Sequence, residues 1–238
     1  MRIALIGYGK MGKAIERIAI ARSHEIVLKI DLDNGLEMTA ENLRKAEVAI
    51  EFTGPASAAD NLLRCAQAGI RTISGSTGWL EQFETIKNAF TENDSAFLYA
   101  SNFSIGVNIF FELNKKLAAL MAPHKEYAVE MLEIHHTQKK DAPSGTAITL
   151  AEQVMKEIPS LKSWVNRSAQ KPGELPIVSK RLDPAPGTHE VRYFSEIDDI
   201  EIIHTAHNRD GFAGGAVLAA EYIRDKKGIF TMKDVLGF

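Results

Sequence analysis

The densest group of chemically capable side chains lies in the segment Glu133–Ala147, where two adjacent histidines are followed by lysines, an aspartate and a serine. His135 and His136 are neighbours, so in an extended backbone they face opposite ways and should have different roles. A histidine titrates near neutral pH, which suits one of the two to proton transfer. Adjacent histidines without a nearby cysteine or an i, i+4 partner do not match zinc-ligand spacing, so we expect no metal site.

The same segment contains groups that can bind an anion. Ser144 is a natural N-cap, and the backbone N–H groups of Gly145 and Thr146 would project from the start of the following helix toward an anion. Lys139 adds a point charge for a carboxylate. A solvated basic loop in front of an ordinary capped helix is the alternative that the residues alone leave open.

A second set of residues fits a dinucleotide. The turn Gly7–Gly12 reads Gly-Tyr-Gly-Lys-Met-Gly, follows an apolar run directly and opens a helical stretch, as the dinucleotide fingerprint requires. Gly7 permits the tight turn, Gly9 lets backbone N–H groups approach a pyrophosphate, and Gly12 allows close packing of the helix on the strand. Turn glycines without a ligand are the alternative.

Asp31 stands at the end of the second apolar run, nineteen residues after Gly12. An acidic side chain at this position can accept hydrogen bonds from both ribose hydroxyls, which favours NADH. Two later loops, Gly75–Gly78 and Ala100–Phe103, also follow predicted strands. Because ligands of open α/β sheets bind outside the carboxyl ends of the strands, these loops could line the nicotinamide side. Surface turns rich in small polar residues fit these two loops equally well.

Short β-branched runs alternate with helical stretches in the first half of the chain. This alternation predicts parallel strands joined by crossover helices, which is a doubly wound α/β sheet of the Rossmann type. The predicted strands are Arg2–Ile6, Glu25–Ile30, Glu47–Phe52, Arg71–Ser74 and Ala96–Tyr99, and the predicted helices are Met11–Ser23, Ser57–Ala68 and Leu80–Phe90.

After Ser101 the pattern changes, and we expect a second, smaller α+β domain that binds the substrate. Within it we predict helices at Ile105–Met121 and Ser144–Ile158, strands at Tyr127–Ile134, Glu190–Phe194 and Asp199–Thr205, and a loop with short strands at Ser160–Pro186. A final helical run, Gly214–Asp225, would return to the first sheet. The dinucleotide-binding domain would then comprise residues 1–104 completed by a C-terminal helix at 213–238, and residues 105–212 would form the substrate-binding and oligomerisation domain.

The composition excludes several classes of function. The chain has 238 residues, a formal charge of −3 and a pI near 6.2, so no basic field would attract nucleic acid or an anionic membrane. No apolar run reaches the ~20 residues that span a bilayer. The single cysteine, Cys65, can form no intrachain disulfide, which suits a reducing compartment, and we expect a cytoplasmic protein.

The pattern His-His-x-x-Lys-x-Asp-Ala-Pro-Ser-Gly-Thr-Ala at His135–Ala147 resembles the dihydrodipicolinate (4-hydroxy-tetrahydrodipicolinate) reductase family. The resemblance covers essentially the whole chain. Its other segments are Gly7–Gly12, Glu51–Pro55, Gly75–Gly78, Asn102–Ser104, Gly187–His189 and His204–Arg209. It implies an enzyme of lysine (diaminopimelate) biosynthesis that uses NAD(P)H to reduce 4-hydroxy-tetrahydrodipicolinate or dihydrodipicolinate to tetrahydrodipicolinate.

The roles of individual residues follow from this resemblance. It implies that His135 is the proton donor or acceptor and that Lys139 is a second proton donor or a carboxylate binder. His136, Gly145 and Thr146 would hold the dicarboxylate substrate. The implied cofactor contacts are Gly7, Tyr8, Gly9, Lys10, Met11, Gly12, Asp31, Gly75, Ser76, Thr77, Ala100, Ser101, Asn102 and Phe103. A homotetramer built through the sheet of the second domain is also implied.

Two departures from the family's pattern bear on the cofactor. Lys10 stands where many members have arginine, and Leu32-Asp33 follows Asp31 where members that use NADPH readily have a basic residue. We therefore expect NADH to be preferred, with NADPH possible. Two other functions stay open: another small two-domain NAD-dependent dehydrogenase, which substrate assays would separate, and a non-catalytic NAD-sensing module, which would bind NADH without turnover.

Overall fold

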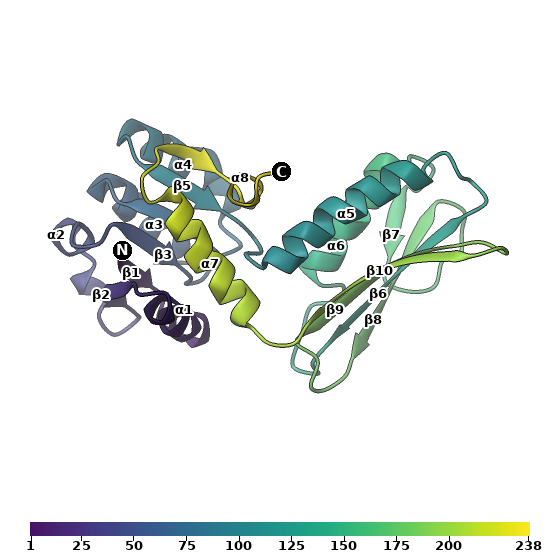
Figure 1. Ribbon diagram of the computed structural model, residues 1–238, viewed down its shortest axis with the longest axis horizontal. Helices are drawn as coiled ribbons and strands as arrows, with labels where there is room; N and C mark the ends of the chain where they lie inside the picture. The colour runs from purple at the N-terminus through teal and green to yellow at the C-terminus, as the bar shows by residue number, and fades with distance from the viewer. The chain divides into compact units, whose positions relative to one another are not determined.

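A computed structural model describes all 238 residues, Met1–Phe238. The chain divides into two compact units: the first comprises Met1–Ile105 together with Arg209–Phe238, and the second comprises Gly106–Asn208 (Figure 1). No helix combines the length and the apolar composition that crossing a membrane requires.

The first unit is a six-stranded parallel sheet in the order β11-β5-β4-β3-β1-β2. Its strands are β1 (Arg2–Ile6), β2 (Glu25–Ile30), β3 (Val48–Glu51), β4 (Arg71–Ser74), β5 (Ala96–Tyr99) and β11 (Gly228–Phe230). Helices α2 (Ala40–Leu43), α3 (Ala58–Ala68) and α4 (Phe83–Glu92) share one core with the sheet, and α1 (Lys10–Ala21), α7 (Asp210–Ile223) and α8 (Met232–Leu236) share the other. The prediction of a doubly wound parallel sheet is confirmed.

Three predictions about the elements of the first unit were wrong. The segment Leu80–Phe90 is not one helix, because Leu80–Gln82 forms a 3-10 turn before α4 begins. Helix α7 begins at Asp210, earlier than Gly214, because the glycines of this stretch serve close packing: a Cβ at Gly215 would lie 1.8 Å from the carbonyl oxygen of Phe103. The predicted C-terminal helix 213–238 is not continuous, because α7 ends at Ile223 and the short strand β11 and helix α8 follow it.

Cys65 lies on α3 inside the first core and is fully buried. Burial raises the pKa of its thiol to about 12, so the side chain is an unreactive packing group. This agrees with its place in an apolar helical stretch.

The second unit is a five-stranded mixed sheet in the order β10-β9-β6-β8-β7. Its elements are α5 (Ile105–Met121), β6 (Ala128–His135), α6 (Gly145–Glu157), β7 (Ser163–Val165), β8 (Glu174–Arg181), β9 (Gly187–Phe194) and β10 (Asp199–Ala206). Strand β6 pairs antiparallel with β9 and parallel with β8. Side chains of α5 and α6 share a core with one face of this sheet, and Figure 1 shows both helices on that face.

Two predictions in the second unit need correction. Glu174–Arg181 is one eight-residue strand within the segment predicted as loop, because Leu175 and Ile177 alternate into the core although Pro176 and the charged residues around them indicated a loop. Strand β9 begins at Gly187 and not at Glu190. The three added residues include His189, which the register places directly opposite Glu133 of β6.

Candidate active site

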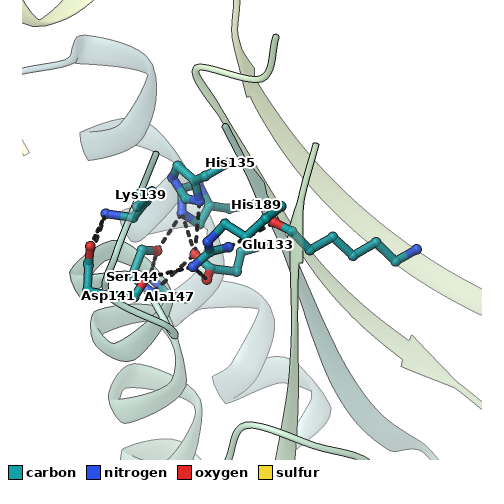
Figure 2. A network of polar contacts seen from close by, with 9 residues as sticks. Glu133, His135, Lys139, Asp141, Ser144, Ala147 and His189 are labelled. Carbon is teal, nitrogen blue, oxygen red and sulfur yellow. Dashed lines mark hydrogen bonds and ion pairs between the residues drawn. The ribbon is translucent and has the colours of Figure 1, made fainter. Parts of the chain in front are cut away.

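Glu133 and His135 occupy alternate positions at the end of β6, so both side chains point to the buried face of the sheet. Glu133 has no exposed side-chain surface, and His135 is also buried. The Nδ1 atom of His135 lies 3.1 Å from Oε2 of Glu133, which is within ion-pair distance (Figure 2). The segment singled out by its histidines therefore contains a buried carboxylate–imidazole pair.

Two further groups hold the Glu133 carboxylate. The backbone N–H of Ser144 donates to Oε2 at 3.1 Å, and a guanidinium nitrogen of Arg181 donates to Oε1 at 3.0 Å. Burial by itself raises the pKa of Glu133, but the contacts from His135, Ser144 and Arg181 outweigh burial and hold the pKa well below its usual value. The carboxylate is therefore charged at physiological pH.

His189 completes this network from β9. Its Nε2 atom lies 3.1 Å from the hydroxyl of Ser144 and 4.0 Å from Oε2 of Glu133. Its ring meets that of His135 edge to face, with 5.1 Å between the centroids. Burial, and after it the nearby His135, lowers the pKa of His189 to about 3, so this imidazole is neutral at physiological pH.

The ligand atoms of Glu133, His135 and His189 lie within 4.8 Å of one another, a spacing that could hold a metal ion. However, both oxygens of Glu133 already accept hydrogen bonds, and the Arg181 guanidinium places a positive charge beside the carboxylate. The arrangement therefore fits a hydrogen-bonded network better than a cation site. That the segment holds no metal stays a prediction.

Ser144 is the N-cap of α6, as predicted: its hydroxyl accepts a hydrogen bond from the N–H of Ala147 at 3.2 Å. The first helical residue is Gly145, and a Cβ at that position would meet no atom within 4 Å. The start of the helix therefore borders open space next to the Glu133 network. This is the geometry that suits N–H groups of the first turn to an anionic ligand.

Lys139 and Asp141 form an ion pair in the loop between β6 and α6, with Nζ 2.8 and 2.9 Å from the two carboxylate oxygens. The contact with Lys139 lowers the pKa of Asp141. Figure 2 shows this pair beside the turn at Ser144. Lys140 is exposed, and His136 is half-buried just beyond the end of β6, outside the Glu133 network. The two histidines therefore have different surroundings, as their adjacency predicted.

In the first unit the glycine turn has the geometry that the fingerprint requires. Gly7 has a φ of +93°, and a Cβ there would lie 2.0 Å from the carbonyl oxygen of Phe52. A Cβ at Gly12 would lie 2.3 Å from the carbonyl oxygen of Gly7, so α1 packs directly on the turn. Gly9, the N-cap of α1, has open space beside it. Gly7 and Gly12 are thus needed for packing, and Gly9 leaves room for a ligand.

Asp31 is exposed at the end of β2, where its own loop holds it: its N–H donates to Asn34 at 2.7 Å and its carboxylate accepts from Leu32 N at 3.0 Å. The nearby Lys29 is already paired, because its Nζ lies 2.6 Å from a carboxylate oxygen of Glu16. The same Nζ stands 4.8 Å from the centre of the Tyr8 ring. The hydrogen bond to Glu16 raises the pKa of Lys29.

Glu51, at the end of β3, is a buried acid whose role the sequence did not reveal. Its carboxylate accepts hydrogen bonds from the hydroxyls of Ser74 at 2.6 Å and Ser76 at 2.7 Å, and from the N–H of Thr53 at 2.9 Å, while the Thr53 hydroxyl also donates to it. One side chain thus fastens the loops that follow β3 and β4. The sequence signal was an acid ending an apolar strand.

The loop after β5 lies beside this cluster. The N–H of Ala100 donates to the carbonyl of Ser74 at 3.2 Å, and Asn102 accepts from the N–H of Ser104 at 2.9 Å. Phe103 is buried, with its ring centre 5.6 Å from that of Phe52. Ser101 and Thr77 are exposed. The predicted cofactor residues therefore divide into exposed loop positions and buried anchors such as Phe103 and Ser76.

A doubly wound sheet with a glycine turn before its first helix, joined to a unit that has a buried carboxylate–imidazole pair beside a helix N-terminus, is typical of a two-domain dinucleotide-binding oxidoreductase. The model of the dihydrodipicolinate reductase N-terminus matches residues 1–103, and that of the C-terminus matches residues 106–236. The chain belongs to the dihydrodipicolinate reductase family. Membership of this dinucleotide-binding reductase family implies use of NADH or NADPH.

Individual relatives agree with this assignment. The 4-hydroxy-tetrahydrodipicolinate reductase of Christiangramia forsetii is 52% identical over 236 residues, which cover 99% of this chain and 98% of the relative. That of Methanosarcina barkeri is 36% identical over 97% of this chain and 83% of its own length. Among solved structures, dipicolinate-bound dihydrodipicolinate reductase from Paenisporosarcina sp. TG-14 has a TM-score of 0.77 at 25% identity, covering 97% of each chain.

Proposed function

We propose that this chain is a cytoplasmic enzyme of lysine biosynthesis that reduces 4-hydroxy-tetrahydrodipicolinate, or dihydrodipicolinate formed from it, to tetrahydrodipicolinate with NAD(P)H. One observation carries the proposal within the molecule: the buried Glu133–His135 pair adjoins the start of α6 and the Lys139 loop. An acid–base imidazole beside an anion-binding helix end suits a cyclic imine that carries carboxylates. The reaction itself is inferred from membership of the dihydrodipicolinate reductase family.

The first unit would bind the cofactor and the second the substrate. The open space at Gly9, directly at the start of α1, suits a pyrophosphate, and exposed Asp31 would accept hydrogen bonds from the ribose. The loops fastened by Glu51 would lie on the nicotinamide side. A bound reduced nicotinamide supplies the hydride.

NADH is the cofactor that we expect to be preferred. A 2′-phosphate at the ribose would meet the carboxylate of Asp31, with no basic residue at positions 32 or 33. Lys29 could otherwise neutralise that phosphate, but its ammonium group is paired with Glu16 and stands over the ring of Tyr8. For Lys29 to neutralise the 2′-phosphate, its ammonium group would have to leave this pair. This adds to the free-energy cost of binding NADPH.

For the substrate we assign His135 to proton transfer at the reacting imine. Lys139 and the first-turn N–H groups at Gly145 and Thr146 would hold the carboxylates, with His136 as a further contact. Lys139 is held by Asp141, so a substrate carboxylate would share or replace that partner.

The open face of the second sheet supports a homotetramer. Strand register places Val178, Leu132, Glu190 and Ile203 side by side across β8, β6, β9 and β10, on the face away from α5 and α6. Val178 and Ile203 are 39% and 55% exposed, which is high for aliphatic side chains on a sheet. We assign this face to subunit contacts.

The test is oxidation of NADH, followed at the nicotinamide absorbance band, with freshly made product of the preceding synthase as substrate. Substrate-dependent oxidation is expected, with no oxidation when an ordinary hydroxy acid or amino acid replaces it. If NADH binds but no substrate-dependent oxidation occurs, the chain is a binding module and the proposal is wrong.

A further inference from the structure

We infer that Glu133 is a positioning residue of the reaction, because it fixes which nitrogen of His135 carries the exchangeable proton and ties that imidazole to the helix end that holds the substrate. This inference rests on the proposed function. The resemblance to known reductases assigned roles to His135 and its neighbours in the loop but none to Glu133, Arg181 or Ser144.

The tautomer of His135 follows from its contact with Glu133. Its Nδ1 atom stands 3.1 Å from a carboxylate oxygen that is charged, and two lone pairs at that distance would repel each other. The contact has ion-pair distance without hydrogen-bond geometry. A hydrogen on Nδ1 removes the repulsion, and this tautomer leaves Nε2 as the nitrogen that exchanges a proton with a ligand. In the Ser-His-Asp triad a buried carboxylate orients an imidazole in the same way.

A glycine lies beside the Nε2 atom of His135. A Cβ placed on Gly187 would lie 3.1 Å from the Nε2 atom of His135, closer than an ordinary van der Waals contact. Glycine at this position therefore keeps a side chain from crowding the nitrogen that Glu133 leaves available. The Glu133 contact and the glycine at position 187 are independent features, and both leave the Nε2 atom of His135 available for proton transfer.

Glu133 also contacts the segment that contains the proposed substrate-binding groups. Oε2 of Glu133 also accepts from the N–H of Ser144, the N-cap of α6, and Arg181 donates both to Oε1 and to the carbonyl of Asp141 at 2.6 Å. One buried carboxylate and one guanidinium thereby hold the loop that contains Lys139 against β6 and β8. The proton-transfer group and the carboxylate-binding groups share a single anchor.

The charged groups around His135 determine how a substitution of Glu133 should affect proton transfer. The titratable and charged groups around the His135 imidazole are Glu133 on its own strand, Arg181 of β8, His189 of β9, and Lys139 and Asp141 of the loop. His189 is neutral, and Lys139 is paired with Asp141, so Glu133 is the nearest negative group that can stabilise a protonated His135. Replacing Glu133 by an amide removes this stabilisation while keeping the size of the side chain.

Glu133→Gln is the main test, in the full-length enzyme with the synthase product and NADH. We expect kcat to fall about 100-fold with a smaller change in KM, because the groups that contact substrate remain. The limb of the kcat–pH profile that requires a protonated donor should move to lower pH, because the variant removes the negative charge beside the donor. A purely structural role would instead raise KM and lower the melting temperature, leaving the pH limb in place, and would overturn the inference.

Glu174→Gln is the matched control. Glu174 lies in the same unit, is paired with Arg167 at 2.9 Å and accepts backbone N–H groups, and the contact with Arg167 lowers its pKa to about 2. It is the first residue of β8, at the opposite end of that strand from Arg181. This variant should keep wild-type kcat and pH dependence. A loss equal to that of Glu133→Gln would mean that removing any arginine-paired carboxylate disturbs the fold, which would overturn the inference.

A measurement on the unsubstituted protein covers the case in which Glu133→Gln fails to fold. The 15N chemical shifts of the histidine rings distinguish the two neutral tautomers, and they require no turnover. We expect His135 to be protonated on Nδ1 and bare on Nε2 in its neutral form. The opposite tautomer would refute the inference, whereas absent turnover in the wild type would refute only the proposed function.

Discussion

The substitution Lys139→Ala separates chemistry from folding most cleanly, because the side chain is only partly buried and has one partner. Its side chain is 23% exposed, and its ammonium group donates to both oxygens of Asp141, whose side chain is 59% exposed. Ion pairs with this much solvent contact contribute about 0–1 kcal/mol to folding. Removing Lys139 should therefore lower the unfolding free energy by no more than ~1 kcal/mol.

The kinetic loss should be much larger. Removing a preorganised charge from an active site typically costs a factor of about 10²–10³ in rate, equivalent to ~2.7–4 kcal/mol of transition-state stabilisation. We expect kcat/KM for the dicarboxylate to fall at least ~100-fold, with NADH affinity unchanged because the cofactor residues lie in the other unit. The effect on catalysis thus exceeds the effect on stability by ~2 kcal/mol or more.

Steady-state NADH oxidation, NADH titration by fluorescence and thermal unfolding measure the three quantities. Lys140→Ala is the matched control, since Lys140 is the adjacent lysine, is exposed and lies outside the family pattern, so it should change each quantity little. If Lys139→Ala retains near-wild-type kcat/KM, or if Lys140→Ala is as damaging, the assignment of Lys139 to the substrate is wrong.

Three further predictions concern the cofactor site and the assembly. NADH should exceed NADPH in kcat/KM by ~10-fold, and Glu16→Gln, which frees Lys29, should narrow that ratio; equal efficiencies in the wild type would refute the role of Asp31. Glu51→Gln should raise the Kd for NADH several-fold, because the N–H group of the new amide would face the donors of Thr53 and Ser76. An unchanged Kd would show that the loops after β3 and β4 do not bind the cofactor. Ile203→Asp should shift the molar mass measured by light scattering from that of a tetramer to that of a smaller assembly. Ile197→Asp, in the turn before β10, should leave the molar mass of the tetramer unchanged.

The elements that the sequence predicted well are those whose pattern is local. The strands Arg2–Ile6 and Ala96–Tyr99 have dense β-branched or aromatic runs, and the helix Ile105–Met121 has long apolar periodicity, so the structure reproduces their bounds. Strand β8 was missed because a proline and several charged side chains interrupt its apolar alternation. Its place between β6 and β7 depends on tertiary pairing, which local residues do not encode.

The distinction between local pattern and tertiary pairing also applies to the candidate site. Two contiguous motifs, Gly7–Gly12 and His135–Ala147, stand out by residue type and spacing, whereas the roles of their individual residues follow from the family resemblance and stay predictions. The groups that hold them come from distant strands: Arg181 of β8 and His189 of β9 reach Glu133 only because of the register of the second sheet. A histidine and an arginine in separate strands give no sequence signal of their shared partner.

Each unit contains one buried carboxylate that accepts several hydrogen bonds, Glu51 in the first unit and Glu133 in the second. Their partners differ, and this difference determines which substitutions are informative. Glu51 is held by hydroxyl and N–H groups, whereas Glu133 also faces the guanidinium of Arg181. Removing Arg181 would leave a charge without compensation in a buried site, which commonly destabilises a fold by about 3–5 kcal/mol. Such a variant would lose folding and chemistry together, so its inactivity would identify neither role. Neutralising the carboxylate itself leaves no buried anion to compensate, and the catalytic contribution of this network is therefore best measured at Glu133.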